Sequence, residues 1–155
     1  MQRYFQDYLG ISHVIWLKHG ILGDHTDGHI DNLARFVGPR TVMCAFTENS
    51  RDKNYSALKA NYDALRRSRD QDGKPLEIVK LPMPHVKPGS YANFYIANEV
   101  VLVPAFGHAN DEIARRIIQQ AFPDREAIGV DCSDIICGGG TLHCITQQQP
   151  FSVKL

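Results

Sequence analysis

The sequence lacks a net charge and lacks any long hydrophobic run. Its 17 Lys and Arg residues balance 17 Asp and Glu residues, so the basic excess that is typical of nucleic-acid-binding proteins is absent. No apolar stretch approaches the roughly 20 residues that a membrane-spanning helix needs. The opening MQRYFQDYLG also lacks the apolar region of a secretory signal peptide. We therefore expect a cytoplasmic protein that binds neither nucleic acid nor membrane.

Cysteine is scarce and is not arranged in pairs. The four cysteines show no Cys-x-x-Cys spacing, which argues against a disulfide framework and favours reduced thiols. The 155 residues suffice for one domain with a sizeable core. Histidine, by contrast, occurs seven times, and several of these histidines lie close to Asp or Cys.

Two parts of the chain share one order of elements. In each, a polar loop containing glycine leads into an apolar strand, TVMCAF in the first part and VVLVPAF in the second. Helical spacing of apolar residues follows at 51–68 and again at 110–122, where Asn110 is the expected cap. A further strand is expected after each helix, at 76–82 and at 126–132. The unit is therefore loop, strand, strand, helix, strand.

The two ends of the chain look like parts of further units. The segment 4–10 is typical of the last turns of a helix that Gly10 stops in the left-handed conformation. A strand, HVIWL, is expected at 13–17, and CGGGTLHCITQQQP at 137–150 begins a third copy. We predict an α/β fold of about two full modules with a fragment at each side, in which the modules bury their faces against one another.

Two clusters combine side chains that can perform chemistry. GDHTDGHIDN at 23–32 and GGGTLHC at 138–144 each follow an expected strand, where α/β units commonly place their sites. A thiol must be activated to attack at neutral pH, a histidine can carry a proton, and a carboxylate can hold a cation. Cys144, His29 and Asp31 supply these three groups. In an extended stretch, His29 and Asp31 would face one pocket while the residue between them faces the core.

Plainer interpretations stay open. Each cluster alone is more often a turn whose polar groups are satisfied locally, and the triple glycine can serve a tight bend or a close backbone approach. A zinc ion bound by His25, His29 and Cys144 is a further alternative, although paired ligand spacing is lacking. In a strand, His143 and Cys144 would face opposite ways, which leaves His143 only a supporting or structural role.

The same stretches resemble the agmatine deiminase family, also called the Porphyromonas-type peptidylarginine deiminase family, of the guanidino-group-modifying superfamily. The similarity runs along nearly the whole chain, through VIWLKHGILGDHTDGHIDNLARFV, SYANFYIANEVVLVPAFG, FPDREAIGVD and GGGTLHCITQQQP. The resemblance implies a pentein-type α/β propeller of five ββαβ-type modules around a central pocket. It implies that residues 1–155 are the C-terminal part of a single deiminase domain whose N-terminal modules are absent.

The resemblance also implies roles for individual residues. Cys144 matches the nucleophile, His29 the general acid and base, and Asp31 the carboxylate that grips the guanidinium. Further positions match the substrate-binding wall of the pocket: Asp27, Gly28, Asn93 and Gly139. Two positions depart from the family, which often has an acidic residue where His25 stands and Asn where Thr141 stands.

The implied reaction is the hydrolysis of agmatine to N-carbamoylputrescine and ammonia through a covalent thiouronium on Cys144, as a step of putrescine biosynthesis and without a metal or other cofactor. Agmatine is preferred to arginine because the resemblance is closest to agmatine deiminases. In addition, no arginine stands beside the two motifs to bind an α-carboxylate, although Arg35 is near in sequence.

Two rival functions and two modes of association stay open. One rival is a truncated, catalytically inactive fragment that acts as a structural or binding piece. The other is a Cys–His hydrolase such as a papain-like protease, although those enzymes usually place the cysteine first in the chain. Exposed module edges predict self-association or pairing with a missing N-terminal half.

Overall fold

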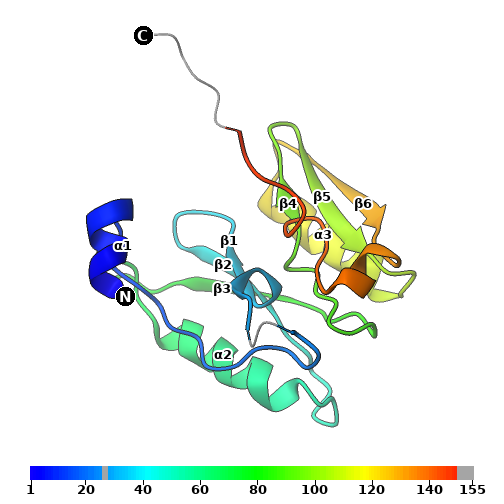
Figure 1. Ribbon diagram of the computed structural model, residues 1–155, viewed down its shortest axis with the longest axis horizontal. Helices are drawn as coiled ribbons and strands as arrows, with labels where there is room; N and C mark the ends of the chain where they lie inside the picture. Colours follow the sequence, from blue (N-terminus) through cyan, green and yellow to red (C-terminus); the bar gives the residue numbers. More distant parts are fainter. Residues whose placement is uncertain (26–27, 150–155) are drawn as a thin grey trace.

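A computed structural model of the chain describes residues 1–25 and 28–149 and contains two units built alike (Figure 1). Module one consists of β1 (Ala34–Phe36), β2 (Thr41–Ala45), α2 (Tyr55–Arg67) and β3 (Glu77–Leu81). Module two consists of β4 (Tyr95–Ile96), β5 (Val100–Ala105), α3 (Asn110–Ala121) and β6 (Glu126–Asp131). The repeated ββαβ order confirms the predicted module.

Each module forms a three-stranded mixed sheet with the same topology. In module one, Met43 of β2 lies opposite Arg35 of the antiparallel strand β1 and opposite Val79 of the parallel strand β3. In module two, β5 likewise pairs antiparallel with β4 and parallel with β6. A parallel pair needs a crossover connection, and α2 and α3 provide the two crossovers. Figure 1 shows α2 along the first sheet and α3 along the second.

The crossover helices turn apolar faces to their sheets. In α2, Leu58 and Leu65 are buried at helical spacing, as predicted. In α3, Ala114 and Ile118 are buried, whereas Ile113 is 51% exposed. The inward face of α3 is therefore rotated away from Ile113, one of the apolar residues of its helical pattern.

The start of α3 differs from the prediction. The residue that caps the helix is Ala109, and Asn110 is its first helical residue, with a side-chain amide that donates to the Met83 carbonyl at 2.9 Å. Asp111 accepts the backbone N–H of His108 at 2.9 Å, so a carboxylate satisfies the N–H groups that precede the helix. The Asn110 amide thereby ties α3 to the segment that follows β3.

The main core spans both modules. Met43 and Leu81 of module one pack with Val101, Val103 and Ile118 of module two. On the other face of the first sheet, a second cluster packs against α2: Ala34, Val42, Cys44, Leu65 and Leu76. The first sheet is therefore covered on both faces, by its own helix and by the neighbouring module, which confirms that the modules bury their faces against one another.

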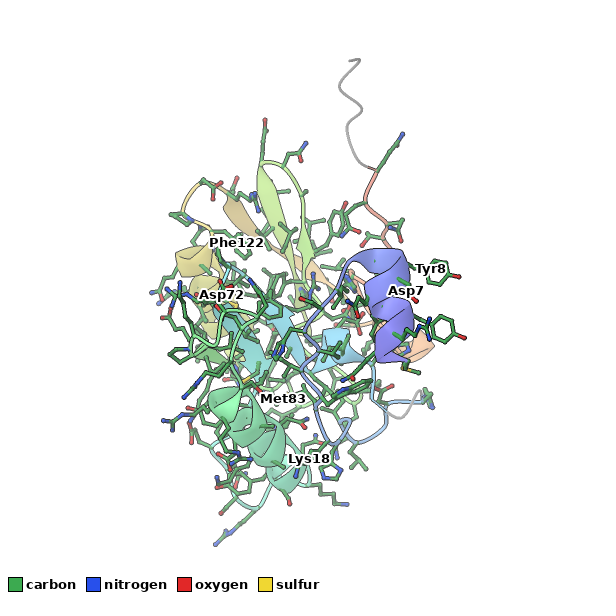
Figure 2. The ribbon with its side chains drawn as sticks, turned by 90° about the vertical axis from the view of Figure 1, so that its left-hand side faces the viewer. Asp7, Tyr8, Lys18, Asp72, Met83 and Phe122 are labelled. Atoms are coloured by element: carbon green, nitrogen blue, oxygen red, sulfur yellow. The ribbon has the colours of Figure 1, made fainter. Side chains whose placement is uncertain are left out.

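The N-terminal segment is less integrated. Helix α1 (Gln2–Leu9) ends at Gly10 with φ 67° and ψ 14°, the predicted left-handed stop, but α1 has no buried residue. Figure 2 shows the Tyr8 ring pointing away from the rest of the molecule. In the described chain, residues 13–17 form no strand, because no neighbouring strand supplies a hydrogen-bonding partner. The following residues are held instead by Asn61 of α2, whose Oδ1 accepts the Lys18 N–H at 2.9 Å.

Within residues 1–25 and 28–149, no helix combines the length and the apolar character needed to cross a membrane.

Candidate functional site

Asp31 lies in a short 3-10 turn, η1 (Ile30–Asn32), directly before β1. The turn closes through the Leu33 N–H, which donates to the Ile30 carbonyl at 2.9 Å. Asp31 and Asn32 are buried, whereas Ile30 is 58% exposed. The expectation that the residue between His29 and Asp31 faces the core is therefore wrong, since these residues form a helical turn and not an extended stretch.

Cys144 lies in a turn that follows η2 (Ile135–Gly138), and residues 138–144 are not a strand. In this turn the His143 ring and the Cys144 thiol approach the same oxygen of Asp31. The His143 Nδ1 lies 2.7 Å from Asp31 Oδ2, and the Cys144 thiol donates to that oxygen at 3.3 Å. The expectation that only one of the two side chains can enter the site is therefore wrong, because it assumed strand geometry.

Asn93 connects the two clusters from its buried position before β4. Its amide N–H groups donate to Asn32 Oδ1 at 2.9 Å and to the Cys144 sulfur at 3.1 Å. Its Oδ1 accepts the Thr141 hydroxyl at 2.9 Å and the His143 backbone N–H at 3.0 Å. Both donors and both lone pairs of the amide are thus engaged with protein groups. Sequence reasoning missed this connecting role, and the only signal for it was a polar residue within the apolar stretch SYANFYI.

The three glycines before the thiol have different environments. Gly139 has φ 91°, a left-handed conformation that favours glycine. A Cβ at Gly140 would lie 2.6 Å from the Cys144 sulfur, whereas one at Gly138 would meet nothing within 4 Å. Gly139 therefore serves a bend of the chain, whereas Gly140 allows the backbone to approach the Cys144 thiol closely.

The surroundings of Cys144 favour the protonated thiol. Burial raises its pKa, the N–H of Asn93 lowers it, and the hydrogen bond and negative charge of Asp31 raise it. The S–H that donates to Asp31 fits this balance. A cation bound to Asp31 would offset the negative charge and shift the balance toward the thiolate.

Asp31 also has one carboxylate oxygen that the described residues leave without a hydrogen bond. Its Oδ1 is buried and has no hydrogen-bond partner among the described residues. Buried carboxylate oxygens normally accept hydrogen bonds, because an unsatisfied one loses its hydration without compensation. Asp31 therefore presents an acceptor suited to a ligand with N–H groups and positive charge.

The remaining candidate residues precede Asp31 in the chain. His29 is exposed, and its backbone N–H donates to Asp24 Oδ2 at 2.9 Å, while its ring makes no hydrogen bond to the described residues. Gly28 has φ 123°, and a Cβ there would lie 3.4 Å from Gly20. The predicted binding residue Asp27 lies outside the described residues.

A metal site and an anion-binding arginine were the other two possibilities. Among residues 1–25 and 28–149, no three His, Cys, Asp or Glu side chains are grouped to hold a metal ion. Arg35 donates to the Phe94 carbonyl at 2.8 Å and its guanidinium lies 4.9 Å from the centre of the Phe94 ring. Burial lowers the pKa of Arg35, and the charge of Asp31 opposes that shift. Arg35 is therefore engaged in joining β1 to module two.

Residues 1–150 match the family of Porphyromonas-type peptidyl-arginine deiminases. The chain belongs to this family. A Legionella pneumophila (strain Paris) protein provisionally named agmatine deiminase is 40% identical over 163 aligned positions, which cover 100% of this chain and 47% of that protein. The chain thus spans about half the length of the curated relatives it matches.

Solved structures of agmatine deiminases share the fold. The Enterococcus faecalis agmatine deiminase, described as catalysing its reaction, matches with a TM-score of 0.91 at 33% identity over 96% of this chain and 47% of that one. A cysteine-to-serine variant of the C. jejuni agmatine deiminase with substrate bound matches with a TM-score of 0.81 at 31% identity, over 92% of this chain and 43% of that one. The predicted fold class is confirmed, since these ββαβ modules form part of the pentein-type deiminase propeller.

Proposed function

We propose that this deiminase chain takes part in the hydrolysis of agmatine to N-carbamoylputrescine and ammonia. The observation that carries the proposal is the contact of the Cys144 thiol with the Asp31 carboxylate, one oxygen of which has no hydrogen-bond partner among the described residues. The E. faecalis and C. jejuni relatives, named agmatine deiminases, give the substrate class. The residues argue for agmatine over arginine because Arg35 is already bound to Phe94.

The first step is binding of the substrate guanidinium to Asp31. The planar cation donates N–H groups to the carboxylate and cancels its charge, which lowers the pKa of the Cys144 thiol. The thiol releases its proton to solvent, and the thiolate attacks the central guanidinium carbon to give a tetrahedral adduct. His29 donates a proton to one nitrogen, the carbon–nitrogen bond breaks, and ammonia leaves.

The second step hydrolyses the covalent thiouronium that remains on Cys144. His29 accepts a proton from a water molecule, and the resulting hydroxide adds to the same carbon. The carbon–sulfur bond then breaks, which returns the thiol and releases the urea product. In this scheme Gly28, Asn93, Gly139 and Asp27 shape the wall of the pocket, and the pathway served is putrescine biosynthesis in the cytoplasm.

Turnover is tested by incubating the chain with agmatine and measuring ammonia and N-carbamoylputrescine. We expect Cys144→Ser to abolish product formation, whereas Cys137→Ser, which changes an exposed thiol seven positions earlier, keeps it. Acid quenching followed by mass spectrometry should show an adduct of agmatine minus ammonia on Cys144. Product formed by Cys144→Ser at the native rate would refute the nucleophile.

We also propose that the chain acts as part of a larger propeller, with further deiminase modules covering the side formed by the N-terminal segment and β1. This side holds a cavity of about 430 Å³ lined by apolar side chains such as Phe5, Ile15 and Phe36. Its lining includes large apolar side chains that are exposed and that a neighbouring module would cover, such as Leu9 and Ile30.

The test of this association is a turnover and size-exclusion measurement with and without an N-terminal deiminase fragment. We expect the mixture to elute as a larger species and to gain turnover over the chain alone. If the chain stays monomeric in the presence of the fragment and forms no product, both the association and the activity are contradicted. That result would favour an inactive structural piece.

A further inference from the structure

The His143 side chain contacts the one carboxylate that the proposed reaction uses to hold substrate. Its ring Nδ1 lies 2.7 Å from Asp31 Oδ2, and the His143 side chain is 33% exposed against 12% for Asp31. The backbone of His143 is fixed as well, since its N–H donates to both the backbone carbonyl and the side-chain Oδ1 of Asn93, at 3.2 and 3.0 Å. The ring is thus held on a rigid turn beside the carboxylate.

The two oxygens of Asp31 have different surroundings. Oδ2 accepts from the His143 ring and from the Cys144 thiol, while Oδ1 is buried and has no partner among the described residues. A carboxylate can rotate about its terminal bond and exchange its oxygens unless a donor holds one of them. The His143 contact, at 2.7 Å, is much the shorter of the two.

We propose, on the basis of the proposed deiminase function, that His143 is a positioning residue that holds Oδ2 of Asp31 and so fixes the orientation of the carboxylate beside the Cys144 thiol, where the cationic group of the substrate binds. An ionised carboxylate has no hydrogen to donate, so the proton of this contact lies on Nδ1 of His143. His143 therefore acts through Asp31, while Cys144 and His29 keep the covalent and proton-transfer roles.

Two small electrophiles test this inference on the full chain. Chloroacetamidine is a planar cation at neutral pH, like the guanidinium end of agmatine, and chloroacetamide is its neutral counterpart. Each alkylates a thiolate by forming a carbon–sulfur bond and releasing chloride. The ratio of the two rates at Cys144 measures the preference of the site for the cation, because the thiolate fraction of the unbound chain is the same for both reagents. Cys137, an exposed thiol of the same chain, gives the reference ratio.

We expect the native ratio at Cys144 to exceed the ratio at Cys137, and His143→Ala to lower it about 10- to 100-fold, as for loss of a hydrogen bond to a charged group. His143→Asn places an amide N–H near the position of Nδ1 and should restore the ratio. His143→Gln, the matched control, reaches toward the position of Nε2 and should behave like Ala. The same order should appear in kcat/KM where turnover is measured.

The outcomes separate the inference from the proposed function. A native ratio at Cys144 no higher than at Cys137 overturns the cation-binding function and this inference with it. Two outcomes overturn only the role of His143. In one, His143→Ala keeps the native ratio at Cys144; in the other, His143→Gln restores the ratio and His143→Asn does not. If His143→Ala does not fold, as judged by circular dichroism, the comparison of Asn with Gln decides.

A second readout is the tautomer of His143. Nitrogen-15 spectra of the neutral imidazole should show the proton on Nδ1 in the native chain and its transfer to Nε2 in Asp31→Ala. A native spectrum with the proton on Nε2 would overturn the proposed contact.

Discussion

Module one is packed on both faces of its sheet, whereas module two leaves part of its sheet exposed. In β2, Val42 and Met43 are both buried although they face opposite ways, one toward α2 and the other toward module two. In β6, Ala127 is buried while its neighbour Ile128 is 37% exposed. All four of these residues are apolar, so the difference shows that burial depends on having a neighbouring module and not on residue type alone.

The largest expected effect of this difference concerns thiol reactivity. Cys44 in β2 is buried, and desolvation raises its pKa to about 12. We expect iodoacetamide to label Cys44 about 1000-fold more slowly than the exposed Cys137 at pH 8, because the thiolate is the reactive form. Peptide mass mapping of native and urea-unfolded chain checks this, and equal rates in the native chain would mean that β2 is not covered on both faces.

The next effect concerns the free energy of unfolding. Met43→Ala removes a fully buried side chain from the core shared by both modules and should cost about 3 kcal/mol. Ile128→Ala, on the exposed face of β6, should cost less than about 1 kcal/mol. Urea denaturation measures both values. Equal losses would contradict the contrast between the two sheets.

A smaller loss is expected at the junction of the modules. Asn93→Ala removes hydrogen bonds to Asn32, Thr141 and Cys144 and should cost about 2 kcal/mol, since buried partners are left unsatisfied. The pKa of Cys144 should rise further, because the Asn93 N–H lowers it. Alkylation of Cys144 as a function of pH measures this shift. Asn98→Ala, at an exposed position between β4 and β5, is the control and should change neither quantity.

Periodicity predicted the modules because each helix and strand finds its hydrogen-bond partners, and buries one face, within its own module. The segment 51–68 contains α2, and 126–132 contains β6, close to the expected bounds. HVIWL failed as a strand because its β-propensity has no effect without a neighbouring strand. Asn110 failed as a cap because its amide reaches the Met83 carbonyl, a tertiary contact that no local pattern contains.

The candidate site was predicted in part. Asp31, Asn93 and Cys144 come together in the structure although they lie far apart in the sequence. The contact of His143 with Asp31 could not be predicted, since it depends on residues 142–145 forming a turn. The connecting role of the Asn93 amide could not be predicted either, because its four hydrogen bonds depend on how distant segments pack together.

Gly140 has a consequence for how such a site can be lost during evolution. A single base change in a glycine codon yields alanine, and the added methyl group would occupy the space of the Cys144 sulfur, 2.6 Å away. Gly140 is not among the glycines with positive φ, so its backbone accommodates alanine and we expect the sheets and helices to stay in place. A descendant with that substitution would still be recognisable as a member of the family by its sequence and its fold, although its Cys144 thiol would be displaced. Within this lineage, the space beside one glycine is therefore a better marker of retained chemistry than the fold.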